Sequence, residues 1–211
     1  MADRRKTIVA EGYDRIARRY LEWGQTIESD PRDDLLALFA GDLPSGSRVL
    51  ELGCGSGVQS TVELARRFRV LGVDISRAQI RLARRQVPDA SFIRADFMEC
   101  HFGEASFDGV AALYSIVHVP REQHGRLFAD VFRWLVPGGL FLATLGAVDT
   151  PDWIGPWLGE EMFFSGYDAE TNRRMLRTAG FEMVVDEVLT TAEPEGDVRF
   201  LWVIARKPVG T

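Results

Sequence analysis

Cysteine is scarce in this sequence of 211 residues, which contains only Cys54 and Cys100. Two cysteines set far apart provide neither the disulfide framework of small secreted domains nor the ligand cluster of a zinc site. No apolar run approaches the roughly 20 residues that a membrane-spanning helix needs. The first residues, MADRRKTIVAEGYD, also lack the long apolar core of a signal peptide. These absences predict a cytoplasmic protein with no membrane segment and no metal cluster.

Positive charge is also in short supply. The chain has 25 Lys and Arg against 31 Asp and Glu, which gives a net charge of −6 at pH 7. Because such a surface repels phosphate backbones, a nucleic-acid partner is disfavoured. Hydrophobic residues make up 46% of the chain, which is ordinary for a globular protein with one sizeable core. We expect a monomer or a homodimer.

Two regions with different patterns divide the chain. Residues 1–42 predict a helical cap, because apolar residues recur there at near-helical spacing and Asp30-Pro31 can open a second helix. Residues 43–211 alternate between short apolar strands and helices. Strands are expected at 48–52, 70–73, 91–94, 107–113, 140–145, 181–189 and 198–205, and helices at 58–68, 76–86, 121–135 and 168–178.

This alternation predicts the fold class. Strands that alternate with helices form a doubly wound α/β sheet whose two faces are covered by helices. The last two expected strands are joined by the short polar loop 190–197, which permits only an antiparallel return. We therefore expect a seven-stranded sheet, mostly parallel with an antiparallel last strand, below the N-terminal helical cap.

Three glycines follow the first strand in the segment VLELGCGSG, at positions 53, 55 and 57. Glycine lets the backbone approach a ligand closely, and a helix that starts there offers free N–H groups. A dinucleotide-binding loop has the spacing G-x-G-x-x-G, whereas this sequence has Val58 where the third glycine belongs. Glu51, just ahead of the loop, would repel a pyrophosphate and favour a cationic ligand.

Acidic residues also follow the second and third strands. Asp74 comes about 20 residues past the loop, where a carboxylate can accept hydrogen bonds from both ribose hydroxyls. Asp96 and Phe97 can hydrogen-bond and flank an adenine. S-Adenosylmethionine (SAM) has an adenosine, a sulfonium, an ammonium and no phosphate. SAM therefore fits this set of residues better than a dinucleotide does.

Five elements in this order resemble the class I SAM-dependent methyltransferases of small molecules. They are Glu51-x-Gly53-x-Gly55-x-Gly57, Asp74, Ala95-Asp96-Phe97, Phe107-Asp108 and Leu135-x-Pro137-Gly138-Gly139. The resemblance covers roughly residues 10–205 and implies that SAM is the cofactor and S-adenosylhomocysteine (SAH) the product. It also implies a set of cofactor-lining residues: Glu51, Gly53, Gly55, Asp74, Ile75, Asp96 and Phe97, with the carbonyl of Leu113 facing the ammonium.

The motif Tyr13-Asp14-x-Ile16-Ala17-x-x-Tyr20 resembles the N-terminal helix that many small-molecule members fold over the cofactor. This resemblance implies that Tyr13 or Tyr20 contacts SAM. Tyrosines packed in the core side of an amphipathic helix would give the same pattern, so both interpretations stay open.

Residues after the fourth strand are candidates for the acceptor side, since ligands of such sheets bind beyond the carboxyl ends of the strands. Tyr114 and His118 lie in this segment. His118 could accept a proton from a hydroxyl or an amine as the methyl group arrives, or could be a structural histidine that opens the next helix. Of the other histidines, His124 is expected on a helix surface and His101 in a loop.

The segment 148–167 is too rich in aromatic residues for an ordinary loop, and its prolines and glycines argue against one long helix. Aromatic clusters of this kind often form binding surfaces, so we expect a lid over a mostly apolar acceptor pocket. The candidate wall residues are Trp153, Trp157, Met162 and Phe164. A dimer contact and a small satellite core are the alternatives.

Together these residues predict a SAM-dependent methyltransferase that acts on an oxygen or nitrogen, and less readily on a carbon, of a small, partly apolar metabolite. A non-catalytic SAM-binding module and an NAD-dependent oxidoreductase are the alternatives. Val58 and Glu51 count against the oxidoreductase, and so does the lack of a second catalytic domain. The aromatic segment beside an intact glycine loop counts against the module.

Overall fold

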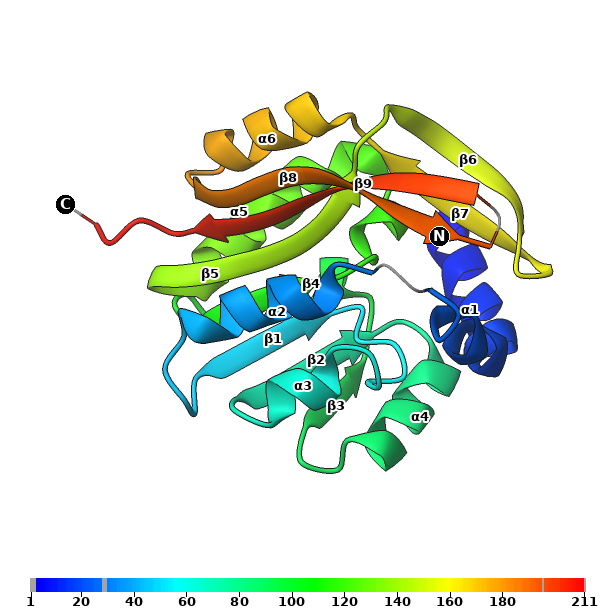
Figure 1. Ribbon diagram of the computed structural model, residues 1–211, viewed down its shortest axis with the longest axis horizontal. Coiled ribbons are helices and arrows are strands. Elements are labelled where there is room, and N and C mark those ends of the chain that lie inside the picture. Colours follow the sequence, from blue (N-terminus) through cyan, green and yellow to red (C-terminus); the bar gives the residue numbers. More distant parts are fainter. Residues whose placement is uncertain (1–2, 28–29, 195, 211) are drawn as a thin grey trace.

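Seven strands form one sheet in the order β3-β2-β1-β4-β5-β9-β8, in a computed structural model that describes residues 3–27, 30–194 and 196–210 (Figure 1). The strands are β1 (Arg48–Leu52), β2 (Arg69–Asp74), β3 (Ser91–Arg94), β4 (Phe107–Ala112), β5 (Leu135–Gly146), β8 (Glu182–Glu193) and β9 (Gly196–Arg206). The pairs from β3 to β5 are parallel, whereas β9 is antiparallel to both β5 and β8. The expected fold class is confirmed.

The strand order reverses at β1, and this reversal decides where a ligand can bind. The chain leaves β1 towards β2 and β3 and then returns to β4 on the other side of β1. At such a switch point the loops after the two neighbouring strands diverge and leave a crevice beyond their carboxyl ends. The loops after β1 and β4 border this crevice, and they carry the three glycines and His118.

Helices cover both faces of the sheet. α2 (Arg32–Gly41) and α3 (Thr61–Ala65) lie on one face, α4 (Arg77–Gln86) packs beside α3, and α5 (His124–Trp134) and α6 (Ala169–Thr178) cover the other face. The helix side chains buried in the two cores include Leu36, Phe39, Leu64, Leu127, Phe128 and Leu176. Coverage on both sides explains why the central strands are continuous apolar runs.

A smaller unit lies over the carboxyl ends of the parallel strands. It consists of α1 (Arg4–Gly24) and the hairpin of β6 (Thr150–Trp157) and β7 (Glu160–Gly166), at the right of Figure 1. Its buried core contains Ile8, Val9, Ile16, Met162 and Phe163. An isolated two-stranded hairpin is marginally stable in water, so packing against α1 supplies the apolar burial that the hairpin needs.

Four segments differ from the sequence-based expectation, and one of them is β5, which begins at Leu135 instead of residue 140. The helix expected at 58–68 is reduced to α3, because the glycine loop continues as turns up to Ser60. The segment 148–167, for which no regular element is predicted, contains the hairpin β6–β7. Leu158 and Gly159 form its turn with φ values of 47° and 80°, and positive φ at both positions matches the twist of antiparallel strands. The last two strands also extend into the loop expected at 190–197.

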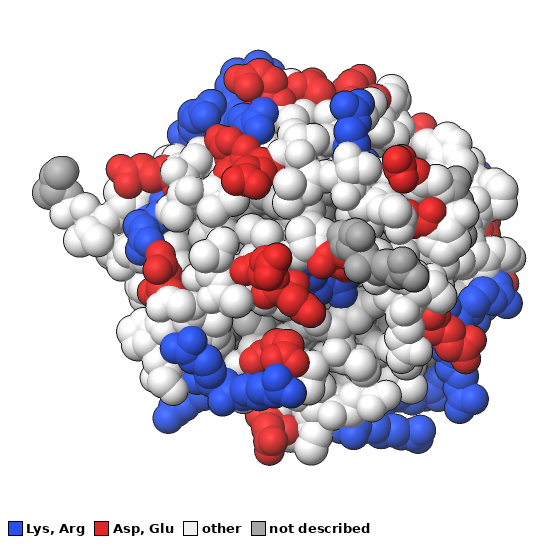
Figure 2. Space-filling model, in the orientation of Figure 1, with Lys and Arg blue, Asp and Glu red and all other residues white. Residues whose placement is uncertain are grey.

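Charged side chains of both signs are interspersed on the face shown in Figure 2, and the basic ones do not merge into one patch there. This distribution agrees with the net charge of −6. Within the described part of the chain, every helix is too short or too polar to cross a bilayer.

Candidate functional site

Two adjoining cavities lie at the carboxyl ends of the parallel strands. The first borders the loops after β1 and β2, and the second lies beside it, between Trp157 of β6 and Phe200 of β9. Six residues line both cavities: Tyr13, Tyr20, Arg32, Gln59, Tyr114 and His118. Side chains at this junction can therefore contact the occupants of both cavities.

The two cavities differ in size. The second has a volume of about 540 Å³, which lies within the roughly 300–1,000 Å³ of small-molecule pockets. The first has a volume of about 90 Å³, so its walls lie close together. Lys6, Val9, Tyr13 and Tyr20 of α1 form one of these walls. Because α1 is not part of the sheet, it is the wall that can move with the least disruption.

The glycine loop forms the floor of the first cavity. Gly53, Gly55 and Gly57 have φ values of 76°, 54° and 80°, a conformation that glycine adopts without strain. A Cβ atom on Gly53 would lie 2.3 Å from the Cβ atom of Ser115, whereas nothing lies within 4 Å of one on Gly55. Gly53 and Gly55, both predicted to contact the cofactor, line the cavity with bare backbone.

Asp74 lies at the end of β2 and lines the first cavity beside Ile75. Its Oδ2 accepts a hydrogen bond from the backbone N–H of Gly55 at 2.9 Å, and its Oδ1 accepts one from Ser76 at 2.8 Å. Burial raises the pKa of Asp74 to about 6, although both backbone hydrogen bonds oppose the shift. These two bonds hold the carboxylate against the glycine loop, where the sequence predicts a ribose.

Glu51 lines neither of the two cavities. Its side chain is buried, and its two carboxylate oxygens accept hydrogen bonds from the hydroxyls of Ser60 and Thr61, the latter at 2.5 Å. Burial raises the pKa of Glu51 to about 7. In this structure Glu51 anchors the turn that leads into α3, and its contact with the cofactor stays a prediction.

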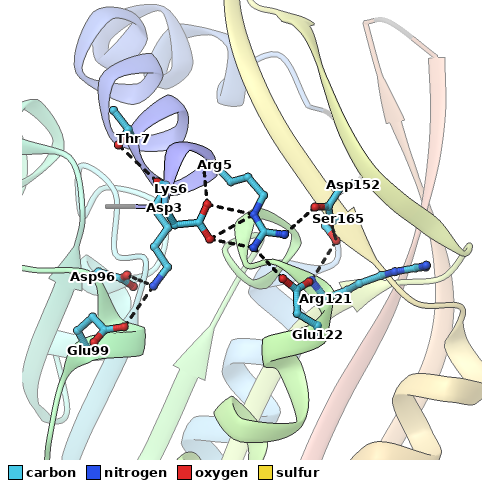
Figure 3. Close-up of polar contacts among 10 residues, drawn as sticks. All are labelled: Asp3, Arg5, Lys6, Thr7, Asp96, Glu99, Arg121, Glu122, Asp152 and Ser165. Atoms are coloured by element: carbon cyan, nitrogen blue, oxygen red, sulfur yellow. Dashed lines mark hydrogen bonds and ion pairs between the residues drawn. The ribbon is translucent and has the colours of Figure 1, made fainter. Parts of the chain in front are cut away.

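The first cavity runs across the sheet from the loop after β3 to the loop after β4. Asp96 and Phe97 line the β3 end, and Leu113 lines the β4 end. Lys6 of α1 pairs with Asp96 at 2.5 Å and with Glu99 at 3.3 Å, as Figure 3 shows. Sequence reasoning missed Lys6 as a cavity residue, because the contact joins two distant parts of the chain.

Arg5 ties the beginning of α1 to the acceptor side (Figure 3). Its guanidinium pairs with Asp3 at 2.8 Å, with Glu122 of the short helix η3 (Arg121–Gln123) at 2.7 Å and with Asp152 of β6 at 2.6 Å. Exposed ion pairs contribute only about 0–1 kcal/mol each. Three acidic partners on one guanidinium nevertheless orient α1 relative to the hairpin.

Tyr13 and His118 form a hydrogen-bonded pair at the junction of the cavities. The Nδ1 atom of His118 lies 2.7 Å from the carbonyl oxygen of Phe163, so Nδ1 carries the proton and donates it there. Nε2 then has a lone pair and accepts a hydrogen bond from the Tyr13 hydroxyl at 2.8 Å. Burial lowers the pKa of His118 to about 4, so the ring is neutral at pH 7.

Aromatic rings form much of the wall of the second cavity. Tyr20, Trp23 and Trp157 lie with ring centroids 5.6–5.9 Å apart, and Tyr114 and Phe164 line the same space. The other two predicted wall residues, Trp153 and Met162, do not line this cavity. Trp153 is 44% exposed, and Met162 is fully buried in the contact between the hairpin and α1.

Two buried side chains that line the first cavity, Gln79 and Arg32, have polar atoms without a hydrogen-bond partner among the described residues, and sequence reasoning missed both. Gln79 is 1% exposed, and neither its Oε1 nor its Nε2 has a hydrogen-bond partner within the described residues. The Nε atom of Arg32 is also buried and has no hydrogen-bond partner within the described residues. An unpaired buried polar group costs roughly 1–3 kcal/mol, which a ligand with hydroxyl, amine or carboxylate groups would relieve.

These residues fit SAM as the occupant of the first cavity. The bare loop backbone, the Asp74 carboxylate and the unpaired Gln79 amide offer hydrogen-bonding groups to an adenosine. Gly55, where nothing lies within 4 Å of a built Cβ atom, admits a ligand at the distance of backbone contact.

The prediction that His124 lies on a helix surface is wrong. His124 is 2% exposed, and its Nε2 donates to the carbonyl of Val119 at 3.0 Å. The reason is its spacing from Leu127 and Phe128, which places it on the buried face of α5. His101 is exposed in a loop, as expected. Within the described ranges, no three His, Cys, Asp or Glu side chains are grouped as a metal site requires.

Residues 49–139 match a family model described as a methyltransferase domain. The chain is 33% identical over 150 residues to an O-methyltransferase of Penicillium expansum. The aligned region covers 66% of this chain and 53% of that protein. The chain is also 30% identical over 148 residues to an uncharacterized methyltransferase of Synechocystis sp.. That aligned region covers 66% of this chain and 68% of the Synechocystis protein. The chain spans about half the length of several curated relatives that it matches.

Solved structures are similar in fold. The magnesium protoporphyrin IX methyltransferase of Synechocystis, crystallised with bound SAH, superposes with a TM-score of 0.70 at 18% identity. The match covers 95% of this chain and 99% of that one. At 18% identity, this similarity shows a shared fold and nothing more.

Proposed function

This chain belongs to the class I SAM-dependent methyltransferases, a family whose cofactor is SAM, and on this premise we propose that it methylates an oxygen or nitrogen of a small, partly apolar molecule. The observation that carries the proposal is the junction of the two cavities, where Tyr13 and His118 line both. A cofactor in the first cavity and an acceptor in the second would meet at this pair.

Alignment is the main contribution of the chain to the reaction. SAM, when bound, supplies a methyl group that its sulfonium already activates. The glycine loop and Asp74 hold the adenosine, and the aromatic wall around Trp157 excludes water from the acceptor. Positioning alone provides effective molarities of around 10⁵ M or more.

Proton removal is the second contribution, since an oxygen or nitrogen acceptor loses a proton when it is methylated. The Tyr13 hydroxyl donates to Nε2 of His118, which leaves the phenolic oxygen free to accept a hydrogen bond from the acceptor. The acceptor proton passes to the Tyr13 oxygen as the tyrosine proton passes to His118. With a pKa of about 4, the imidazolium then releases this proton readily to solvent.

The acceptor class follows from the same pair and from the walls of the second cavity. The pair is placed to take a proton from a heteroatom, so carbon is the less favoured acceptor atom. The relative named as an O-methyltransferase supports oxygen, and nitrogen fits the same geometry. The rings of Tyr20, Trp23 and Trp157 support an acceptor with an apolar part.

His118→Gln and Tyr13→Phe test the proton transfer. We expect each variant to lower kcat by about 10²–10⁴-fold, the usual contribution of general acid–base catalysis, with little change in SAH affinity. The measurement is methyl release from labelled SAM to a panel of phenols, amines and carboxylic acids, with SAH binding followed by calorimetry. Because His118 is already neutral above a pKa of about 4, kcat should not fall between pH 8 and pH 6.

His101→Gln is the matched control, since His101 is exposed in a loop and should leave turnover unchanged. Undiminished kcat in both test variants would remove the pair from the chemistry. If the wild-type chain binds SAH and methylates no member of the panel, the non-catalytic SAM-binding module becomes the better description.

A further inference from the structure

We propose that Arg32 is the receptor for a carboxylate at the junction of the two cavities. The proposal rests on the proposed function, because it adds a residue to the same site. The carboxylate has two possible sources: the amino-acid end of SAM, or the methyl acceptor. Both present the same chemistry to a guanidinium.

The position of Arg32 is unusual for a charged residue. It is the first residue of α2, it is only 9% exposed, and it lines both cavities. Its Nη2 pairs with Oδ2 of Asp30 at 2.9 Å, and its Cζ lies 4.9 Å from the centre of the Tyr114 ring. The buried Nε has no hydrogen-bond partner within the described residues. The guanidinium therefore keeps an unused donor while it is shielded from bulk water.

The orientation of the guanidinium is set by contacts within the chain. Asp30 is held by its own contacts: its Oδ1 accepts hydrogen bonds from the backbone N–H of Arg32 at 2.9 Å and from the Tyr114 hydroxyl at 3.0 Å. Asp30 and the Tyr114 ring thus fix the plane of the guanidinium. A planar, pre-oriented guanidinium matches the geometry of a carboxylate better than a flexible ammonium does.

The location of Arg32 along the first cavity matches the carboxylate of SAM. Lys6 and Arg32 are the two cationic side chains that line this cavity among the described residues. Lys6 lies at the β3 end and is engaged by Asp96 and Glu99. Arg32 lies at the β4 end, against Tyr114. A ligand that places its adenosine between Asp74 and Asp96 brings its amino-acid end to Arg32.

The same donor also faces the second cavity. A carboxylate-bearing acceptor in that cavity would reach Arg32 from the other side, next to the Tyr13–His118 pair. A guanidinium that is shared by two cavities can serve either occupant, so the experiment needs one arm for each source.

The first arm compares SAM with decarboxylated SAM, which keeps the adenosine, the sulfonium and the amine. Calorimetry is done on the wild-type chain, on Arg32→Met and on Lys6→Met, the matched control at the other end of the cavity. If SAM is the source, Arg32→Met weakens SAM binding by about tenfold to a hundredfold and hardly changes the binding of decarboxylated SAM. Lys6→Met changes the affinities for both ligands by the same factor.

The second arm uses benzoate and its neutral analogue benzamide, added to the SAH-saturated chain and followed by ligand-detected NMR. If the acceptor is the source, the wild-type chain prefers benzoate, Arg32→Met loses that preference, and the ratio between SAM and decarboxylated SAM stays as in the wild type. If neither preference depends on Arg32, the proposal is overturned.

Arg32→Lys guards against a folding defect, because it keeps the positive charge beside Asp30. It should retain part of the preference for the carboxylate that Arg32→Met loses, and the melting temperature of each ligand-free variant shows whether it is folded. All readouts are binding affinities. A chain that shows the Arg32-dependent preference without turnover would contradict the proposed function alone, and a chain that binds neither SAM nor SAH would contradict both.

Discussion

At the scale of single residues, Glu51 and Asp74 are two buried carboxylates with different hydrogen-bond partners. Asp74 lines the first cavity, whereas Glu51 faces the turn before α3. Both pKa values are raised, chiefly because burial disfavours the charged form. The glycine loop is therefore flanked by two carboxylates, and the ionisation of each lowers the free energy of unfolding. A bound ligand or a positioning role must offset this loss.

The raised pKa of Glu51 predicts how the free energy of unfolding changes with pH. With a folded-state pKa of about 7 against 4.5 in the unfolded chain, the folded state binds more protons between these values. The free energy of unfolding therefore falls as pH rises through that window, by about 3 kcal/mol at most. Glu51→Gln removes this loss, so the variant should gain stability relative to the wild type between pH 5 and pH 8.

Urea unfolding of the ligand-free chain at pH 5 and pH 8 measures this difference. Glu63→Gln is the control, because Glu63 is an exposed carboxylate on α3 and should not alter the pH dependence. Equal pH dependence in the wild type and Glu51→Gln would show that Glu51 does not carry a raised pKa.

At the scale of elements, α1 is held over the site by a few specific contacts. Asp14 of α1 accepts hydrogen bonds at Oδ1 from the Ser76 hydroxyl at 2.6 Å and from the backbone N–H of Ala78 at 2.8 Å. Asp14 thus satisfies free donors at the beginning of α4, the helix that follows Asp74. One side chain thereby joins α1, which forms a wall of the first cavity, to the beginning of α4.

Asp14→Ala should loosen α1 without unfolding the sheet. Loss of a charged acceptor that serves two donors typically costs about 1–3 kcal/mol. We expect faster hydrogen exchange in residues 4–24 and weaker SAH binding, both measured by mass spectrometry with and without SAH. Glu11→Ala is the control, since Glu11 is exposed on α1 and pairs there with Arg15. Unchanged exchange in α1 would show that the hydrogen bonds of Asp14 do not hold it in place.

At the scale of the whole molecule, the chain has two packing units whose buried cores differ in size. The seven-stranded sheet is covered on both faces, whereas α1 and the hairpin share a small core of their own. Gly12 shows how close this contact is, because a Cβ atom there would lie 2.8 Å from Cε of Met162. Units with few buried contacts open first, so α1 and the hairpin should exchange together and before the sheet.

Ile16→Ala and Leu142→Ala separate the two units. Ile16 is 1% exposed in the smaller unit, and Leu142 is fully buried in β5. Each substitution should cost about 2–5 kcal/mol where it acts. Ile16→Ala should speed hydrogen exchange in 4–24 and 150–166 only, and Leu142→Ala should speed it throughout the sheet. A uniform increase with Ile16→Ala would mean that the chain unfolds as one unit.

Much of the architecture was already determined by the sequence. The order of strands and helices, the glycine loop and the acidic residue after the second strand all depend on local patterns: apolar periodicity, turn residues and caps. Ser76 caps α4 as expected, and Asp168 caps α6. Tyr13 and His118 were each recognisable as candidate site residues. Tyr13 lies on an amphipathic helix, and His118 lies beyond the end of a strand. Such signals are contained within a few residues of the chain.

Only the tertiary structure decided which of these side chains meet. The direction of Glu51, the burial of Met162 and His124, and the hydrogen bond between Tyr13 and His118 depend on contacts between distant segments. Arg32, Gln79 and Lys6 were also identified as site residues only from the structure, because their contacts join distant segments. A local pattern records whether a residue is polar and which face it occupies. The partner on that face is set by how helices and strands pack, because the same pattern is compatible with many packings.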